Sequence, residues 1–407
     1  MDLQKYSELI SDVALNVKDG DIIRIKTDVQ NLDFVRTLAE ECYKKGAHEV
    51  YTILNDERLT RLNMNYMSEE RLSHFGKYHL DEALDYAESG TKYVSVVGGD
   101  PDIFKGIDPK KIQLRTKTVS SLMKPVMKYT MNDINSWTVI GYPSKSWAKT
   151  VFPDLTEDEA VKKLAEAIEK AIRLDQCDPK KAWEDHIDRL EKTAKFLNEK
   201  NFDKLIYTSD SGTNLEIGLP EGHIWVSATS VNAKGEKFLP NLPTEEVFTA
   251  PDRNRVNGIV YATKPLFAAG LIKDFYVKFK DGKAIDYKAE VGHEFLKNLI
   301  ETDEGSAFLG EVALVEDTSP INKSGIIFYN TLFDENASCH LALGKAYPTC
   351  VKNGENMTDE KLIKIGVNDS SVHDDFMIGD NTLKIVGVTK EGEEILIMEK
   401  GVFVYEG

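Results

Sequence analysis

Residues 18–54 read KDGDIIRIKTDVQNLDFVRTLAEECYKKGAHEVYTIL. After the turn at residues 18–20, the β-branched run at 21–26 predicts a strand. Residues 34–45 carry apolar positions at helical spacing, and Gly46 can adopt the left-handed conformation that commonly ends a helix. Residues 48–54 again have the composition of a strand. A strand, a helix and a second strand in so short a segment predict a parallel βαβ unit.

The same alternation continues through the first half of the chain. A helical pattern precedes this unit at residues 3–17, and strands are predicted at 93–97 and 137–142. Two long helices should then begin at a capping box, Thr156 to Glu159, and at Asp178-Pro179. We therefore predict that residues 1–203 form an α/β domain with an open, largely parallel sheet and two bridging helices.

The pattern changes near residue 204 to short alternating strands separated by tight turns, of which Lys280-Asp281-Gly282-Lys283 is the clearest. A chain of 407 residues is also long enough for two domains. We predict that residues 204–407 form an α+β domain with a mixed or antiparallel sheet.

The net charge of −17 makes binding to nucleic acid or to an anionic membrane unfavourable, because such binding relies on Lys and Arg. The N-terminal residues lack the pattern of a signal peptide, so a cytoplasmic location is expected.

The four cysteines show no CxxC spacing, and all four are predicted to be small buried hydrophobic residues. Gly98-Gly99-Asp100-Pro101 is predicted to be a structural turn, because its acidic residue would repel a phosphate.

A metal site is the strongest candidate for chemistry. Two divalent ions held about 3.5–4 Å apart need several carboxylates, one of them bridging, and one or two imidazoles. A set without thiolates suits Zn²⁺, Co²⁺ or Mn²⁺ better than Mg²⁺ or Ca²⁺. The second half of the chain supplies such a set: Glu245, Glu246, Glu311, Glu335, His340, His373 and Asp375.

Each of these residues also has a simpler interpretation. Glu245-Glu246 could be a solvated surface pair, and His340, in a small apolar stretch, could be an ordinary core histidine. Glu311 is stronger evidence for a site, because it begins the apolar run VALV. Burying a carboxylate there is unfavourable unless a positively charged or hydrogen-bonding partner compensates it. The remaining histidines are predicted to be surface or incidental residues: His48, His74, His79, His186, His223 and His293. The pattern alone favours a metal site and leaves the reaction open.

Four segments carry a resemblance to a known family. They are LPTEEVFTAPD at 242–252, GEVALVEDTSPI at 310–321, YNTLFDENASCHLALGKAYP at 329–348 and NDSSVHDDFMIG at 368–379. In this order they resemble the signature segments of the aminopeptidase T/aminopeptidase S family of metalloproteases, and the resemblance extends over essentially the whole chain. It implies a two-metal exopeptidase of broad specificity that removes N-terminal residues from peptides and acts as a homodimer, with an α/β N-terminal domain and a C-terminal catalytic domain.

The resemblance also implies roles for individual residues. The family pattern places a metal ligand directly before Val247, which selects Glu246 over Glu245. Tyr347 falls on the catalytic tyrosine and could donate a hydrogen bond to the developing oxyanion. Glu311 or Glu335 would relay the proton, and the sequence does not separate them. The implied metal ligands are Glu246, Glu311, Glu335, His340, His373 and Asp375.

Two other functions compete with this one. A two-metal phosphoesterase uses similar ligands but adds Arg or Lys to hold phosphate, and the ligand motifs contain Lys345 only. A metal-carrying or ligand-binding protein without catalysis would also fit the open α/β half.

Overall fold

The computed structural model describes residues 1–267 and 270–404. Its contacts divide the chain into two compact units. The first comprises Met1–Glu184, Thr229–Pro243 and Ile327–Leu332, and the second comprises Asp185–Ala228, Thr244–Ile326 and Phe333–Gly407. The chain therefore enters the second unit inside a helix and returns twice to the first. These units are defined by contacts and do not test the predicted domain boundary near residue 203, which stays a prediction.

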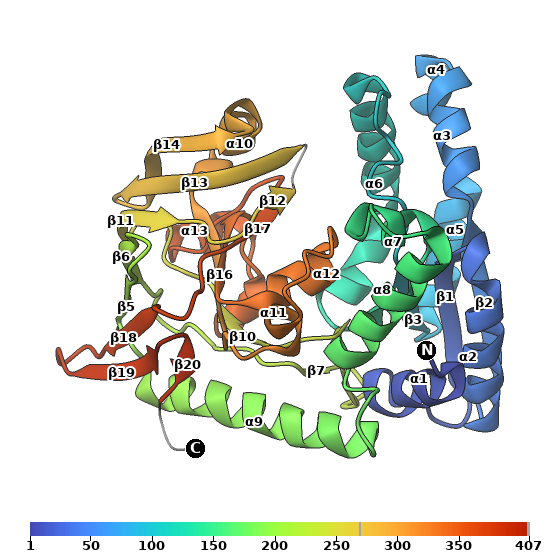
Figure 1. Cartoon of the computed structure of the whole chain (residues 1–407), viewed down its shortest axis with the longest axis horizontal. Helices are drawn as coiled ribbons and strands as arrows, with labels where there is room; N and C mark the ends of the chain where they lie inside the picture. The colour runs from blue at the N-terminus through green and yellow to red at the C-terminus, as the bar shows by residue number, and fades with distance from the viewer. Residues whose placement is uncertain (268–269, 405–407) are drawn as a thin grey trace. The chain divides into compact units, whose positions relative to one another are not determined.

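The first unit is built on a five-stranded parallel sheet with the order β2-β1-β3-β4-β9 (Figure 1). This confirms the predicted open parallel sheet. Its helix α2 packs on β1 and β2, as a βαβ crossover should. The strands are β1 Ile22–Asp28, β2 Glu49–Asn55, β3 Lys92–Val97, β4 Trp137–Gly141 and β9 Asn241–Leu242, and a separate pair is formed by β7 Ser230–Val231 and β8 Lys237–Phe238.

The helices of the first unit begin where the sequence places caps. The Thr156 side chain accepts from the Glu159 amide, and the Glu159 side chain accepts from the Thr156 amide, which is the predicted capping box. The helices are α1 Leu3–Leu9, continued by a π-helical turn Ile10–Ala14, α2 Leu32–Lys44, α3 Glu57–Tyr66, α4 Glu69–Leu72, α5 Lys77–Glu88, α6 Pro109–Met131, α7 Lys145–Val151 and α8 Glu157–Ala171, with a 3-10 turn at Val29–Asn31.

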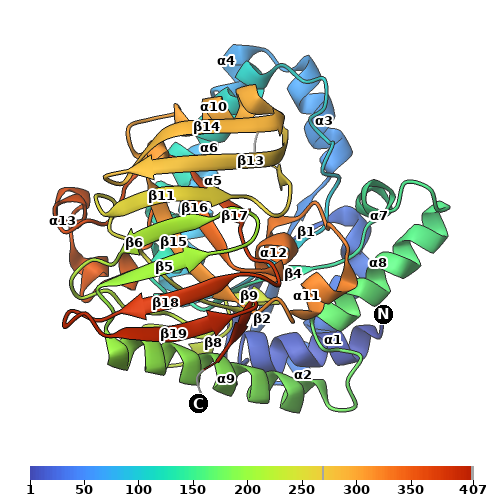
Figure 2. The same cartoon turned by 60° about the vertical axis from the view of Figure 1, so that its left-hand side comes forward.

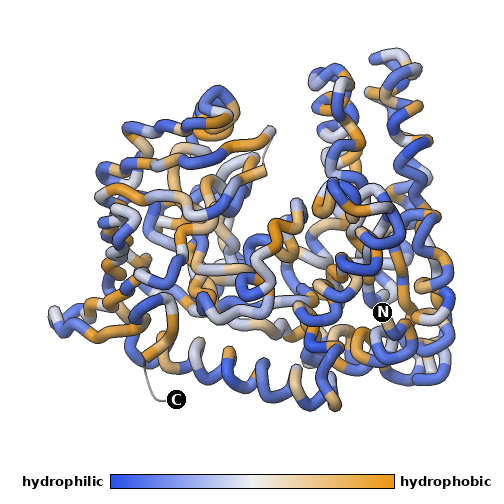
Figure 3. Tube along the Cα trace, in the orientation of Figure 1, coloured by the Kyte–Doolittle hydropathy of each residue, from blue (hydrophilic) through white to orange (hydrophobic). Residues whose placement is uncertain are grey.

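The helix α9, Pro179–Lys200, begins in the first unit and ends in the second. The predicted cap is present, because Asp178 Oδ1 accepts a hydrogen bond from the Lys181 amide. The helix is amphipathic, with hydrophobic residues set among hydrophilic ones along its length (Figure 3). Its apolar side buries Trp183, Leu190 and Leu197.

The second unit contains a large antiparallel sheet with the order β12-β13-β11-β6-β5-β18-β19-β20, and β14 pairs with β13. The hairpin between β13 and β14 turns at Asp281-Gly282, as predicted. The strands are β5 Lys204–Thr208, β6 Asn214–Gly218, β11 Val256–Tyr261, β12 Leu266–Phe267, β13 Leu271–Lys280, β14 Lys283–Val291, β18 Lys384–Val388, β19 Glu394–Glu399 and β20 Val402–Phe403.

A second, four-stranded antiparallel sheet of this unit has the order β10-β15-β16-β17. Its strands are β10 Glu246–Thr249, β15 Leu309–Val315, β16 His340–Gly344 and β17 His373–Met377. In both views β16 and β17 lie alongside β11 and β13 of the large sheet (Figures 1 and 2). Phe376 of β17 makes the contact, with its ring centroid 5.7 Å from that of Phe275 on β13.

The remaining helices are short. They are α10 His293–Ile300, α11 Pro320–Ser324, α12 Thr331–Asp334 and α13 Asp359–Lys364, together with 3-10 turns at Gly305–Ala307, Glu335–Ala337, Pro348–Cys350 and Gly354–Asn356. Among the residues that the structure describes, no helix is long and apolar enough to cross a membrane.

The prediction for the cysteines is correct for three of the four. Cys42, Cys339 and Cys350 are buried, whereas Cys177 is exposed. Cys177 lies in the turn between α8 and α9, on the part of the turn that faces solvent, whereas Leu174 of the same turn is buried.

Two glycines in hairpins of the large sheet allow a matched test of backbone strain. Gly282 and Gly392 both have φ +85°, but only at Gly282 would a Cβ overlap the carbonyl oxygen of Arg253. The left-handed conformation costs a residue with a Cβ about 1–2 kcal/mol. We expect Gly392→Ala to lower the free energy of unfolding by about that amount and Gly282→Ala to lower it by more, measured by denaturant unfolding. Equal losses for the two variants would show that the hairpin at 282 shifts without cost.

Candidate metal centre

One face of the four-stranded sheet collects five of the predicted ligands. Residues directly opposite each other on neighbouring strands share a face, as do residues two apart on one strand. Glu311 lies opposite Ala342, which lies opposite Asp375, so these three share a face. The same pairing places the other three ligands on it: His340 opposite Ala313, Glu246 opposite Val315, and His373 opposite Gly344.

Small residues leave room for these side chains. Ala313, Ala342 and Gly344 lie on this face between the ligands, and the strands here are buried. Gly344 has φ +108°, and a Cβ there would overlap the carbonyl oxygen of Val372. The sheet therefore provides a recess lined by imidazoles and carboxylates.

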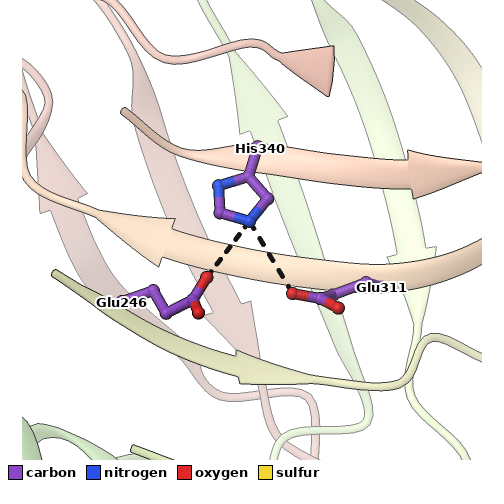
Figure 4. Close-up of side chains that lie close together, drawn as sticks. All are labelled: Glu246, Glu311 and His340. Atoms are coloured by element: carbon purple, nitrogen blue, oxygen red, sulfur yellow. Dashed lines mark ion pairs between the residues drawn. The ribbon is translucent and has the colours of Figure 1, made fainter. Parts of the chain in front are cut away.

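The first group of side chains meets around His340 (Figure 4). Its Nε2 atom is 3.1 Å from Oε2 of Glu246 and 3.7 Å from Oε1 of Glu311. Each residue offers one ligand atom, and these atoms lie within 4.8 Å of one another, so the group could hold one metal ion.

The second group meets around His373. Its Nε2 atom is 3.4 Å from Oε2 of Glu311 and 3.5 Å from Oδ1 of Asp375. These three residues could also hold one ion. Glu311 belongs to both groups and faces each with a different oxygen. A bridging carboxylate in a two-metal site has this arrangement.

Hydrogen bonds at the other ring nitrogen orient both imidazoles. His340 Nδ1 lies 3.2 Å from the carbonyl oxygen of Ser338, and His373 Nδ1 lies 2.6 Å from that of Lys345. A carbonyl oxygen can only accept, so each Nδ1 carries the proton and each Nε2 faces the carboxylates. This is the orientation in which a histidine binds a metal through Nε2.

The buried charges are strongly coupled. Burial opposes ionisation of Glu311, but the imidazoles of His340 and His373 lower its pKa to about 2. Burial likewise opposes the charged form of His373, yet Asp375 and Glu311 raise its pKa to about 12. The pKa of His340 is raised well above its usual value against the same effect of burial, chiefly by Glu246. A divalent ion would displace the two imidazolium protons, so its binding should release protons.

The donors fit a divalent ion. Oδ1 of Asp375 is buried and forms no hydrogen bond among the described residues, and its 3.5 Å ion pair with Nε2 of His373 leaves it able to bind a cation. Four carboxylates of the site, Glu246, Glu311, Glu335 and Asp375, face only two imidazoles. Metal charge would correct both features, and imidazole with carboxylate is a donor set typical of Zn²⁺ and its neighbours.

Glu335 lies beside these groups but belongs to neither. It starts the 3-10 turn Glu335–Ala337 and is partly buried. Its burial, followed by the charges of Asp375 and Glu246, raises its pKa well above the usual value. The structure thus separates Glu335 from Glu311, which the sequence did not.

Tyr347 adjoins the second group. Its ring lies edge-on to that of His373, with centroids 5.0 Å apart, and next to Phe248, at 5.9 Å. Burial, followed by the charge of Glu311, raises the pKa of Tyr347 well above its usual value. The phenol therefore keeps its proton and can act as a hydrogen-bond donor.

Glu245 and His186 differ from their predicted surroundings. Both are buried, and Nε2 of His186 is 3.5 Å from Oε2 of Glu245 and 2.9 Å from the carbonyl oxygen of Thr244. Of the two alternatives predicted for His186, a surface or an incidental residue, the surface position is wrong, because its helix buries the face on which it lies. The spacing Trp183, His186, Leu190 was the signal for this. His223, predicted to be a surface or incidental residue, is buried, and its Nδ1 lies 3.0 Å from the Pro220 carbonyl oxygen.

Lys345 does not offer a free cation for phosphate. Its ammonium group is 3.0 Å from Oδ1 of Asp369, and its carbonyl oxygen orients His373. The arrangement thus gives no support to the phosphoesterase alternative.

Comparison with known proteins finds matches over nearly the whole chain. The model of the thermophilic metalloprotease (M29) family matches residues 1–403. The chain is 42% identical over 406 residues to aminopeptidase 2 of Geobacillus stearothermophilus, covering 100% of this chain and 98% of that protein. It is 38% identical over 403 residues to aminopeptidase T of Thermus aquaticus, covering 99% and 98%.

Solved structures give the same result. Wild-type AmpT from Thermus thermophilus superposes with a TM-score of 0.93 at 37% identity, covering 99% of each chain. A 2,5-dihydroxypyridine dioxygenase from Pseudomonas putida KT2440 superposes with a TM-score of 0.54 at 10% identity over 99% of this chain and 97% of that one, which shows a shared fold alone. On these matches, the chain belongs to the thermophilic metalloprotease (M29) family and is a metalloaminopeptidase, a hydrolase of the exopeptidase class.

Proposed function

We propose that this enzyme removes N-terminal residues from peptides of many sequences with a two-metal centre. The observation that carries the proposal is that two groups of ligands share Glu311, one oxygen to each. Glu246, Glu311 and His340 would hold one ion, and Glu311, His373 and Asp375 the other, with Zn²⁺, Co²⁺ or Mn²⁺ as the candidates. Two such ions would supply a Lewis acid for the scissile carbonyl and a water that ionises near neutral pH.

Glu335 is the proton relay in this proposal. Both oxygens of Glu311 face imidazoles, whereas Glu335 lies in neither ligand group. Burial, followed by the charges of Asp375 and Glu246, raises its pKa, which favours uptake of a proton. Glu335 would accept the proton of the attacking water and deliver it to the leaving amine.

Tyr347 stabilises the negative charge that develops on the substrate oxygen. Its phenol stays protonated next to His373, so it can donate a hydrogen bond to this oxygen. Such a donor acts mainly in the transition state.

A free α-amine on the substrate would have to meet a carboxylate or a metal ion, and the proposed site contains both. The α-amine and the first peptide carbonyl are common to all N-terminal residues, which is consistent with broad specificity. The sequence-based expectations of a cytoplasmic homodimer that binds peptides, and neither nucleic acid nor membranes, complete the proposal.

A panel of aminoacyl-p-nitroanilides with and without Zn²⁺, Co²⁺ and Mn²⁺ tests the proposal. We expect chelation to abolish hydrolysis, with the circular dichroism spectrum unchanged, because the sheets have apolar cores that do not depend on metal. An added divalent ion should restore the activity. The matched control is the N-acetylated substrate, which should not be cleaved. Full activity after verified metal loss, or equal rates on acetylated and free substrates, would contradict the proposal.

Three Glu→Gln substitutions separate the roles of the carboxylates. Glu246→Gln removes the charge that balances an ion, so we expect it to lose about one metal per chain together with activity. Glu335→Gln should keep both metals and lower kcat by about 10²–10⁴-fold, the range for loss of a general base. Glu245 pairs with His186 and not with a candidate ligand, so Glu245→Gln should retain metal and most activity.

Metal content by elemental analysis and steady-state kinetics give the readouts for these variants. Loss of an ion from Glu335→Gln would make Glu335 a ligand, as the family resemblance implies, and would remove its relay role. If Glu245→Gln loses metal and activity and Glu246→Gln keeps both, the metal ligand is Glu245 and not Glu246.

Tyr347→Phe removes one hydrogen-bond donor and keeps the ring that contacts His373 and Phe248. We expect kcat to fall by about 10²–10³-fold with metal content and KM nearly unchanged, because the bond forms mainly in the transition state. A rise in KM at constant kcat would instead assign Tyr347 to substrate binding.

A further inference from the structure

A buried hydrogen bond joins the two segments that carry Glu246 and Glu335. The amide of Glu245 donates to Oδ1 of Asn336 over 2.7 Å, between residues 91 positions apart in the chain. Asn336 directly follows Glu335, and Glu245 directly precedes Glu246. The bond therefore connects the residue next to the proposed relay with the residue next to a proposed ligand.

Both ends of this bond are fixed by further contacts. Asn336 is fully buried, and its carbonyl oxygen accepts a hydrogen bond from Oγ of Ser319 at 2.7 Å. On the other side, His186 contacts the Thr244 carbonyl oxygen and the Glu245 carboxylate. Both anchors lie outside the two groups of candidate ligands.

The position of the bond explains why it matters for the site. Glu246 is the first residue of β10, so the sheet holds the chain only on one side of it. Glu335 lies in a 3-10 turn, outside every strand. Glu335 thus depends on contacts made by its neighbours in the chain, and Glu246 has the support of the strand ladder on one side only.

We propose that Asn336 is a positioning residue that fixes the relay carboxylate of Glu335 relative to the metal ligand Glu246. Its side-chain oxygen holds the Glu245 amide, and its backbone holds Glu335. Removing the side-chain oxygen leaves the Glu245 amide buried without this acceptor and frees both segments to move apart. The inference rests on the proposed two-metal function.

The test compares Asn336→Ala with Asn198→Ala. Asn198 is a matched control, because its Oδ1 also accepts a backbone amide, that of Trp225 at 2.9 Å, but it adjoins no residue of the site. Apo protein would be titrated with Co²⁺ and followed by the visible absorption of the bound ion, and kinetics would be measured on the Co²⁺ enzyme.

For Asn336→Ala we expect Co²⁺ affinity to fall about 10–100-fold, as for loss of other contacts that orient ligands, with an altered absorption spectrum. On the Co²⁺ enzyme kcat should fall at least about 10-fold with KM within about twofold. Asn198→Ala should lower the melting temperature and leave affinity, spectrum and kcat at the wild-type values. Unchanged affinity and kcat in Asn336→Ala, or equal changes in both variants, would overturn the inference.

Two further arms keep the outcomes separate. If Asn336→Ala does not fold, Ser319→Ala is the substitute, because it removes the hydrogen bond that holds the Asn336 carbonyl oxygen. It should lower Co²⁺ affinity and alter the absorption spectrum in the same direction. If affinity and spectrum stay at the wild-type values, the inference is overturned. Wild-type protein that binds no Co²⁺ would contradict the two-metal function itself, whereas wild-type binding that Asn336→Ala leaves intact would contradict only the positioning role.

Discussion

The burial of several carboxylates on one face of a small sheet is the constraint on which the site depends. A buried ionised carboxylate is unfavourable unless a partner compensates it. Glu311 is compensated by two imidazoles, and the protons on His340 and His373 take the role that metal charge would take. Removing any one member leaves the others with uncompensated charge, which is why the group behaves as a unit.

The antiparallel sheet brings residues from four segments that are distant in sequence into one group of side chains. Alternation along each strand and pairing between strands determine that Glu311, His340, His373 and Asp375 share a face. The intervening Asp374 points to the other face, as does Phe376, which packs against Phe275 of the large sheet. One face is thus rigidly packed, and the other is left for chemistry.

Much of this architecture was predictable because local sequence and global structure agree. The βαβ pattern, the Thr156 capping box and the Asp281-Gly282 hairpin are each determined within a few residues. Successive side chains of an extended segment point to opposite faces, and Glu246 accordingly faces His340 whereas Glu245 faces His186. The environment of Glu245 was not predictable in the same way, because its partner His186 comes from a helix about 60 residues away and is joined to it by tertiary packing alone. The exposure of Cys177 likewise depends on what packs over a turn.

The roles within the site follow the kind of structure that carries each residue. The side chains with ligand geometry lie on strands, whose ladders fix them within a sheet. Glu335 and Tyr347 lie instead on short turns next to it, Tyr347 directly before the turn Pro348–Cys350. Because Glu335 lies outside the strand ladders, its distance from the ligands needs another determinant. The hydrogen bond from the Glu245 amide to Asn336 supplies one without a strand. The ligand residues are thus positioned by the sheet, whereas Glu335 is positioned by a side-chain hydrogen bond of its neighbour.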